Sequence, residues 1–344
     1  MRKVLFPLLV LSMVLILAGC SLSRQAISPP ANQVNPENGT KLSISGSIVS
    51  GTLIVEPQAG LAPYLSLVQS AHHSIDLNSY LLTDHSLVSA LVQKAQSGVN
   101  VRVIVAGNPY RDQKVVDEER AGFAGTKVQF RLAPAQFGAP YTFDHAKYLV
   151  VDSTRAILGS SNMDYSGLGG GNREYDYETS DPGIVANLTA LFNADWSGQS
   201  VQLVHPGPLV VSPGSEATLV NLIQGAKQRL YIESEELGND RIVLDAVVAA
   251  IQRGVQVEVV LPGKLSRGDR RNAEGLVNAG AHVRYLTRPY PHAKLIVADD
   301  RAFLGSQNIS VSSLDRDREV GIVVEGSPVE RAAQVFQQDF ARAK

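Results

Sequence analysis

The sequence contains few of the residues on which disulfides, metal clusters and stacked nucleobases depend. Its 344 residues include one cysteine, one tryptophan and 6% aromatic residues, and only 19% are charged. A single cysteine cannot form an intramolecular disulfide, a zinc knuckle or an iron–sulfur site. The net charge of −2 provides no long-range attraction to nucleic acid, although a local basic groove stays open. With 44% apolar residues, the chain can still bury a core and fold as one large domain or two ordinary ones.

The one cysteine follows an N-terminal export signal. Arg2 and Lys3 precede a short apolar run, which ends in Leu-Ala-Gly-Cys at Cys20. A membrane-spanning helix needs about 20 apolar residues, so the shorter run predicts a signal peptide over residues 1–19 and an exported protein. The last four residues resemble the bacterial lipobox, which implies cleavage before Cys20 and acylation of its thiol. A plain signal peptide with an incidental cysteine is the alternative.

The segment after Cys20 is expected to tether the protein to a membrane. Ser21 follows the cysteine, and in a double-membraned envelope this resembles sorting to the outer membrane. Residues 20–42 contain several prolines, serines and asparagines without an apolar period, which is typical of a linker. Loss of residues 1–19 removes two basic residues and no acidic one, so the net charge falls from −2 to about −4. We therefore expect an envelope lipoprotein with a mildly acidic body.

The rest of the chain is an internal repeat of two similar copies. Residues 70–103 align with residues 225–259, and in each copy an alternating strand, an amphipathic helix, a glycine and a valine-rich strand follow one another. Two domains are predicted, over residues 43–200 and 201–344. Strands that alternate with helices predict an α/β fold with a mixed, largely parallel sheet in each half. Two homologous halves further predict packing about a pseudo-two-fold axis, with one site at their interface.

Both copies carry the same polar motif at nearly the same spacing. Each has a histidine, a lysine two residues later and an aspartate five residues after the lysine; a Gly-Ser-x-Asn segment and an Arg-Glu pair follow. The first copy has His145, Lys147, Asp152, Ser160, Asn162 and Glu174, and the second has His292, Lys294, Asp299, Ser306, Asn308 and Glu319. The two copies match at many polar positions, and these positions lie in or beside apolar strands. Chance placement of polar residues on the surface does not readily explain such a match.

The position along the strand separates site residues from scaffold residues. Side chains of a strand alternate between its faces, so His145 and Lys147 share a face and Asp152 is expected on the other. The same parity holds for the second copy. We therefore assign the histidines and lysines to a site, and Asp152 and Asp299 to structural hydrogen bonds at the strand end.

Two histidines without a metal-ligand cluster suit metal-independent phosphodiester cleavage. One imidazole can act as nucleophile and the other as general acid. Lys147, Lys294, Ser160, Ser306, Asn162 and Asn308 would bind the charged phosphoryl group. Glu174 and Glu319 would each accept the second ring N–H of the histidine in their own copy and fix its tautomer. No cofactor and no metal is expected.

This doubled HxK(x)4D and GSxN pattern resembles the phospholipase D superfamily, and the resemblance covers residue 45 to the C-terminus. It implies two α/β/α domains about a pseudo-dyad, both motifs in one site, and a phosphohistidine intermediate. It also implies His145 as nucleophile and His292 as acid, an order that the near-symmetry of the copies leaves open. The alternative hypothesis of a non-catalytic binding module is disfavoured, because no motif residue is missing from either copy.

The substrate is less well defined than the chemistry. A membrane tether favours a phospholipid as partner, and the first reading is a hydrolase of phospholipase D type. Transphosphatidylation, as in a cardiolipin synthase, uses the same residues and is the alternative. An exported endonuclease is third, because the charge is negative and aromatic residues for base stacking are sparse. The oligomeric state is not predicted.

Overall fold

The computed structural model describes residues 51–110, 112–201, 203 and 207–344. The predicted signal peptide, the predicted acylation site Cys20 and the tether over residues 20–42 lie outside the described residues. All described residues belong to one compact unit. Among them, no helix is both long and apolar enough to cross a membrane.

The first half of this unit alternates strands and helices. Its elements are β1 (Gly51–Glu56), α1 (Ala62–Gln69), β2 (Ser74–Ser79), α2 (His85–Gln96), β3 (Asn100–Val105), α3 (Gln113–Phe123), β4 (Gln129–Leu132), a 3-10 turn (Ala135–Phe137), β5 (Lys147–Val151), β6 (Arg155–Gly159), β7 (Asn172–Thr179) and α4 (Pro182–Ser197).

The second half repeats this order with two small additions. Its elements are β8 (Leu209–Ser212), α5 (Glu216–Gly225), β9 (Arg229–Ser234), α6 (Arg241–Gln252), β10 (Gln256–Pro262), α7 (Arg267–Ala279), β11 (His282–Leu286), β12 (Tyr290–Pro291), β13 (Lys294–Ala298), β14 (Arg301–Gly305), α8 (Val311–Asp315), β15 (Glu319–Glu325) and α9 (Ser327–Arg342). Asp84 and Asp240 cap α2 and α6 by accepting hydrogen bonds from the backbone N–H three residues later.

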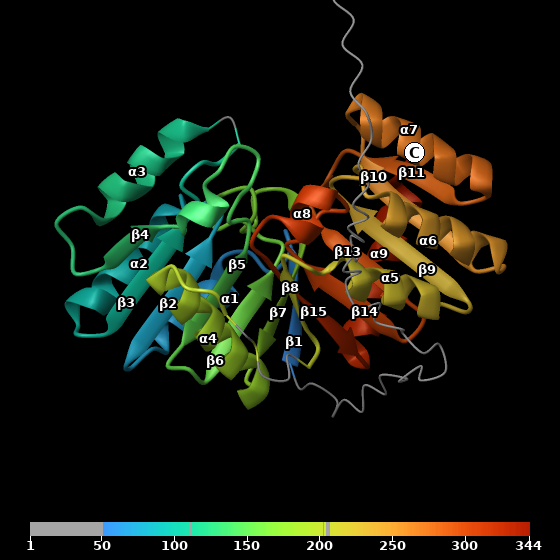
Figure 1. Ribbon diagram of the computed structural model, residues 1–344. Coiled ribbons are helices and arrows are strands. Elements are labelled where there is room, and N and C mark those ends of the chain that lie inside the picture. Colours follow the sequence, from blue (N-terminus) through green and yellow to red (C-terminus); the bar gives the residue numbers. More distant parts are fainter. Residues whose placement is uncertain (1–50, 111, 202, 204–206) are drawn as a thin grey trace, which may run out of the picture. The chain divides into compact units, whose positions relative to one another are not determined.

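Each half forms one sheet, and the two sheets have the same strand order. The first runs β1-β7-β6-β5-β2-β3-β4 and the second runs β8-β15-β14-β13-β9-β10-β11, in equivalent order. The prediction of two homologous α/β layered halves is confirmed. In Figure 1 the two sheets lie side by side, with α3 and α7 at opposite ends, and β6 and β7 contact β14 and β15 across the middle.

The prediction of a largely parallel sheet is wrong. Along the two strand orders, parallel pairs join β2, β3 and β4 in the first sheet and β9, β10 and β11 in the second, and the other neighbours are antiparallel. β12, which lies beside this order in the first sheet, pairs with β7 in parallel. The motif strand β5 ends at Val151 and β6 begins at Arg155. A connection this short makes a hairpin, whereas a parallel pair needs a crossover of roughly a dozen residues.

The two faces of each sheet belong to different cores. Along β5, Leu149 and Val151 pack into a core under α1 and α2, whereas Tyr148 and Val150 pack into a core shared by both halves. The shared core also contains buried residues of α4, α9 and strands β13, β14 and β15. Neither half covers this apolar face by itself, so the interface between the halves is part of the hydrophobic core.

Two buried ion pairs connect the halves at equivalent positions. Arg173 of the first half binds Asp339 of the second, with one Nη2–Oδ1 distance of 3.2 Å, and Arg318 binds Asp195 at 2.9 Å. All four side chains are almost fully buried. Arginine offers a planar set of donors that suits such buried carboxylates. Each arginine precedes a motif glutamate, so these pairs also hold the glutamates at the interface.

Candidate functional site

The two histidines lie where the motif strands begin, at the interface between the halves. His145 precedes β5, and its backbone N–H donates to the carbonyl oxygen of Arg318 in the other half at 2.8 Å. Asp144 pairs with Arg318 as an isolated β-bridge. On the other side, β12 of the second half pairs with β7 of the first immediately before His292. The backbone therefore fixes each histidine against the opposite half.

The motif glutamates bind the histidines of the opposite copies. His145 Nδ1 lies 3.0 Å from Glu319 Oε2, and His292 Nδ1 lies 2.6 Å from Glu174 Oε1. The prediction that each glutamate serves the histidine of its own copy is therefore wrong, because the pseudo-two-fold interface places each glutamate beside the other motif. In both copies the crossed glutamate therefore lies at Nδ1 of the imidazole and not at Nε2.

The two lysines are almost fully buried beside the histidines. Lys147 Nζ donates to the backbone oxygen of His145 at 2.5 Å, and Lys294 Nζ donates to that of His292 at 2.6 Å. Burial lowers the pKa of Lys147 to about 7. A bound phosphoryl group would restore its full positive charge, because a nearby anion favours the charged form.

Tyr80 and Glu235, which sequence reasoning missed, make the surroundings of the two histidines unequal. Ser79 pairs with Lys147 in one sheet and Ser234 with Lys294 in the other, so Tyr80 and Glu235 occupy equivalent positions. The ring of Tyr80 lies edge-on to His145 with centroids 4.6 Å apart. The aligned strands of the repeat were the signal for this pair of positions.

Glu235 is the charged member of this pair of positions. Its Oε2 lies 3.3 Å from Nε2 of His292 and 2.9 Å from Nζ of Lys294. His292 thus has a carboxyl group near each ring nitrogen, those of Glu174 and Glu235. Among the described residues, His145 has only that of Glu319, whose pKa is raised by burial to about 8.

Charges in the site keep the first histidine neutral. Burial and the positive charges of Lys147 and Lys294 lower the pKa of His145 well below its usual value. Burial alone would raise the pKa of Glu235, but the charges of His292 and Lys294 outweigh it and lower this pKa to about 2. At neutral pH the site therefore combines a neutral His145 with a carboxylate at Glu235.

Both histidines open onto one cavity of about 470 Å³. Asn162 and Asn308 line it, as the motif predicted for phosphate-binding residues, and their amide oxygens have no hydrogen-bond partner. The wall also contains aromatic residues of the first half and carboxylates of the second: Tyr80, Tyr110, Tyr141 and Phe143, and Glu235, Glu236, Asp317 and Glu319. The cavity is large enough for a phosphodiester headgroup and an attacking alcohol.

The motif serines have a different role from the predicted one. Ser160 Oγ accepts from the backbone N–H of Tyr175 at 3.0 Å, and Ser306 Oγ accepts from that of Val320 at 2.9 Å. Both are fully buried, and neither lines the cavity. We therefore correct their assignment from phosphate binding to holding the strands that carry Glu174 and Glu319. Ser313 of α8 also donates to Glu319.

The motif aspartates lie at the far ends of the strands and bind backbone. Asp152 accepts from the N–H groups of His72, His73 and Ser74 at 2.7–2.8 Å. Asp299 accepts in the same way from residues 227, 228 and 229. Both adopt a positive φ, which aspartate tolerates better than most residues. Each aspartate thus closes the hairpin after its motif strand.

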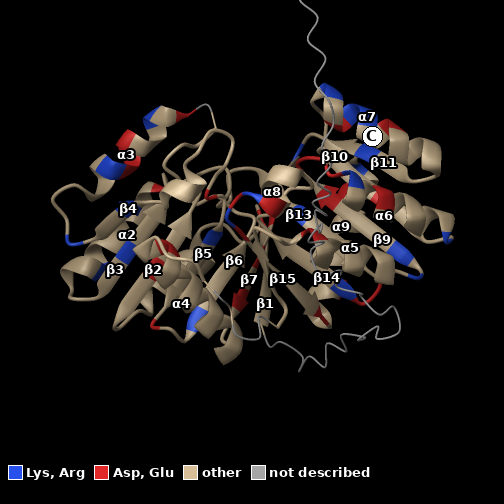
Figure 2. Cartoon of the chain, viewed as in Figure 1, with Lys and Arg blue, Asp and Glu red and all other residues tan. Residues whose placement is uncertain are grey.

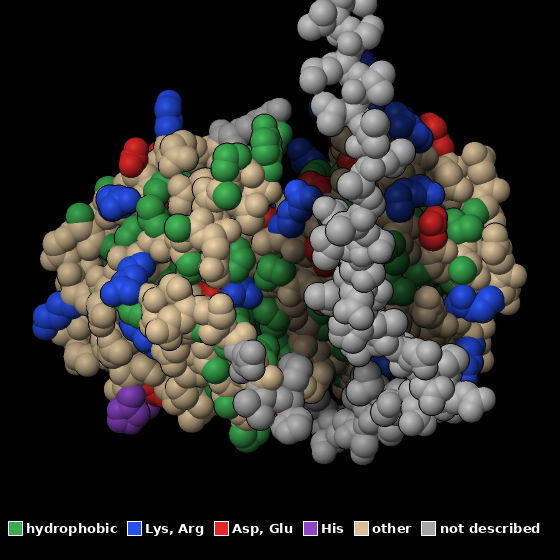
Figure 3. Space-filling model, viewed as in Figure 1, with side chains coloured by type: hydrophobic (Ala, Val, Ile, Leu, Met, Phe, Trp, Pro, Cys, Tyr) green, Lys and Arg blue, Asp and Glu red, His purple; other side chains and the backbone are tan. Residues whose placement is uncertain are grey.

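Charge on the outside of the molecule is mixed in sign. Basic and acidic residues intersperse along α3 and α7 in Figure 2. On the face drawn in Figure 3, the Lys and Arg side chains of the described residues form separate groups with apolar and uncharged surface between them. A protein that follows a phosphate backbone needs a continuous basic track, and this face does not provide one among the described residues.

Comparisons with known proteins place both halves of the chain in one family. The family model described as "Cardiolipin synthase, PLD-like domain" matches residues 64–196 and 219–344. A cardiolipin synthase of Clostridium perfringens (strain 13 / Type A) is 26% identical over 287 residues, which is 72% of this chain and 60% of the relative. The major cardiolipin synthase ClsA of Bacillus subtilis (strain 168) is 26% identical over 321 residues, which is 80% of this chain and 66% of the relative.

The same arrangement of halves occurs in a solved structure. The phosphatidylserine synthase of Haemophilus influenzae Rd KW20 superposes with a TM-score of 0.64 at 12% identity, over 85% of this chain and 87% of that one. A likeness at this identity concerns the fold. The chain spans about 60% of the length of the Clostridium relatives that it matches.

Proposed function

Because this chain belongs to the phospholipase D-like domain family, we propose that it transfers the phosphatidyl group of a phospholipid to an alcohol through a phosphohistidine. The observation that carries the proposal is the pair of histidines in one cavity, each bound at Nδ1 by a glutamate of the other half. The names of the curated relatives favour transfer over hydrolysis, which the sequence had placed first. Hydrolysis by the same residues is the second candidate.

The first step forms a bond between nitrogen and phosphorus. We assign His145 the tautomer whose Nδ1–H donates to Glu319 across 3.0 Å, so that Nε2 carries the lone pair that attacks phosphorus. The bond from phosphorus to the leaving oxygen breaks, and His292 gives that oxygen its proton. Lys147, Lys294 and the two motif asparagines stabilise the charge on the non-bridging oxygens.

The second step reverses the proton transfer. His292 is now neutral and accepts a proton from the incoming alcohol, whose oxygen attacks phosphorus while the bond to His145 breaks. The side chains of Glu236, Ser310 and Ser312 line the cavity near the site and can accept hydrogen bonds from alcohol hydroxyls. These acceptors support an alcohol over a second anion as the attacking group.

Carboxylates in the cavity also disfavour a nucleic acid. Glu235, Glu236 and Asp317 would repel the phosphates that flank a cleaved bond in DNA, whereas a phospholipid brings one phosphate and an apolar tail. The predicted acylation of Cys20 would hold the site at a membrane, which fractionation of a Cys20→Ala chain would test. An exported endonuclease therefore remains the third candidate function.

The acceptor assay tests the proposal directly. The full chain is incubated with vesicles of mixed phospholipids, with and without a primary alcohol, and with plasmid DNA in parallel. We expect a phosphatidyl-alcohol product in excess over phosphatidic acid, because the relatives are named cardiolipin synthases. Phosphatidic acid as the main product at high alcohol would instead establish hydrolysis, and nicked plasmid with intact lipid would refute the phospholipid reading.

The pH profile tests the unequal surroundings of the two histidines. The acid limb of kcat/KM should fall below pH 6.5, because His145 must be neutral and its pKa is lowered. Glu235 is a negative charge that raises the pKa of His145 against the larger lowering effects. In Glu235→Gln this charge is lost, so the acid limb should move to still lower pH.

Glu236→Gln is the matched control for this profile. Burial raises the pKa of Glu236 to about 7, so this neighbour carries only part of a negative charge at neutral pH and makes no ion pair with His292 among the described contacts. Its acid limb should stay close to that of the wild type. An unmoved limb in Glu235→Gln, or an equal move in Glu236→Gln, would contradict the role given to Glu235.

A further inference from the structure

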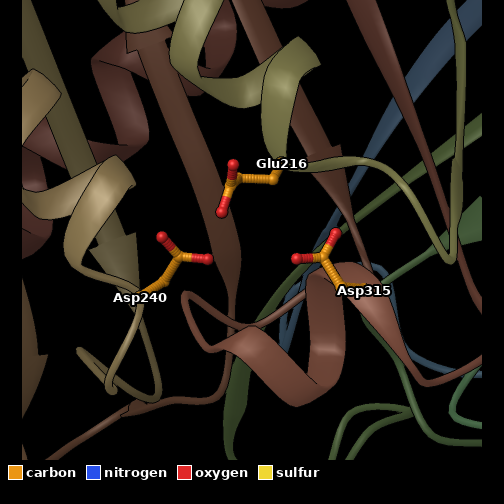
Figure 4. A group of neighbouring side chains, drawn as sticks. All are labelled: Glu216, Asp240 and Asp315. Carbon is orange, nitrogen blue, oxygen red and sulfur yellow. The ribbon is translucent and has the colours of Figure 1, made fainter. Parts of the chain in front are cut away.

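Three carboxylates converge at a second place, formed by the second half alone. Glu216 begins α5, Asp240 caps α6 and Asp315 ends α8. One oxygen of each carboxylate lies within 4.8 Å of those of the other two. In Figure 4 the three side chains point toward the same space from three separate elements. No motif in the sequence indicated this cluster, because the three residues are far apart along the chain.

A buried oxygen of Asp240 lacks a partner in this cluster. Asp240 is fully buried, and its Oδ1 accepts from the backbone N–H of Val243 at 3.0 Å. Its Oδ2 has no hydrogen-bond partner. A buried carboxylate oxygen without a donor costs several kcal/mol unless a cation or a proton neutralises it. Among the described residues, no lysine or arginine forms an ion pair with any of the three carboxylates.

The equivalent positions of the first half lack the carboxylate cluster. Asp84 caps α2 as Asp240 caps α6, but it is only partly buried. The first turn of α1 contains no acidic residue. Leu168 aligns with Leu314, so Gly169 stands where the second half has Asp315. The two additional carboxylates of the second half are therefore not required to build the fold.

We propose that Glu216, Asp240 and Asp315 bind a divalent cation of the calcium class. Calcium takes six to eight oxygen ligands at about 2.3–2.6 Å, so two of its ligands lie at most about 5 Å apart, which fits the three carboxylates. Three negative charges suit a dication, and the exposure of Asp315 leaves water access to the remaining coordination positions. Magnesium demands near-ideal octahedral geometry and usually binds through one or two carboxylates while it keeps several waters, so three convergent carboxylates suit it less well.

The cation connects α8 to the rest of the second half. The backbone oxygen of Leu314 in α8 already accepts from Gly214 and Ser215 just before α5. Ser313 in the same helix donates to Glu319, the partner of His145, and accepts from the backbone N–H of Asn308 at 2.8 Å. We infer a stabilising role for the cation, one turn away from the residues that position the catalytic histidine but outside the cavity.

Binding of calcium to the full chain tests the proposal without any substrate. The protein is stripped with EDTA, transferred to EDTA-free buffer at pH 7.5, and titrated with CaCl2 by calorimetry; thermal unfolding is followed in parallel. We expect one saturable site, with Kd in the range of about 10⁻⁴–10⁻³ M that extracellular calcium modules show. Tm should rise with calcium concentration, because the cation binds the folded state.

Variants of matched chemistry locate the site. Asp240→Asn retains an N-cap, because asparagine caps helices as well as aspartate, but it loses the charge. We expect Asp240→Asn and the exposed Asp315→Asn to bind calcium at least tenfold more weakly. Asp84→Asn makes the same change at the equivalent cap of α2 and should bind calcium as the wild type does.

Three outcomes would overturn the proposal. The first is an absence of calcium binding by the wild-type chain, with a Tm that does not respond to calcium; a proton shared by Glu216 and Asp240 would then account for the cluster. The second is undiminished calcium binding in both Asp240→Asn and Asp315→Asn. The third is tighter binding of magnesium than of calcium.

Discussion

His292→Ala is expected to release one p-nitrophenol per chain from bis-p-nitrophenyl phosphate and then to stop. The p-nitrophenolate ion is a weak base and leaves without a proton, so formation of the bond between His145 and phosphorus does not need His292. The second step does need it, because water or alcohol must lose a proton to attack. His145 that carries a p-nitrophenylphosphoryl group should accumulate, and mass analysis of the quenched protein measures this adduct.

His145→Ala is expected to show no such burst. Without the nucleophilic imidazole no covalent intermediate can form, and steady-state turnover should fall by at least about a thousandfold. His282→Ala, which removes an exposed histidine at the start of β11, is the control and should keep wild-type turnover. A burst in His145→Ala with none in His292→Ala would reverse the two roles. Wild-type turnover in both variants would exclude a site shared by the two halves.

Asp339→Ala is expected to destabilise the chain by about 3–5 kcal/mol. The variant leaves the Arg173 guanidinium buried at the interface between the halves without its carboxylate, and removal of one member of a buried ion pair costs about this much. The measurement is the free energy of unfolding from urea titration at pH 7. Because Arg173 precedes Glu174, the partner of His292, turnover should fall as well.

An exposed residue of the same helix supplies the control for this variant. Glu330→Ala lies in the first turn of α9, outside the interface ion pairs, and should change the free energy of unfolding by about 0.5 kcal/mol or less. A loss in Asp339→Ala no larger than the loss in Glu330→Ala would contradict the importance of the buried pair.

Most of the fold followed from the repeat and from hydrophobic periodicity. The strand, helix and strand of residues 70–103 and 225–259 appear in the structure as β2-α2-β3 and β9-α6-β10, and Asp84 and Asp240 cap the two helices. The direction of the remaining strands was predicted wrongly, because a buried strand has the same apolar sequence pattern in a parallel sheet and in an antiparallel sheet. The short connection between β5 and β6 allows only an antiparallel hairpin for these two strands.

The site was predictable in its residues but not in its pairing. Two copies of one motif identify His145, His292, Glu174 and Glu319 equally well whether each glutamate serves its own histidine or the other. Likewise, the Gly-Ser-x-Asn segment does not reveal that Ser160 and Ser306 turn toward backbone groups while the asparagines line the cavity. Which histidine each glutamate binds, and which motif side chains reach the cavity, depends on the directions of side chains at the packed interface between the halves.

The sequence by itself determined which residues form the doubled motif, that two similar halves carry it, and that no cysteine-based chemistry operates in the described body. Only the tertiary structure decided that the glutamates cross between halves, that Glu235 stands beside His292 where Tyr80 stands beside His145, and that Glu216, Asp240 and Asp315 converge. The physical reason is that motif spacing describes neighbours along one strand or helix. Charges interact through space, and the packing of the two halves sets those distances.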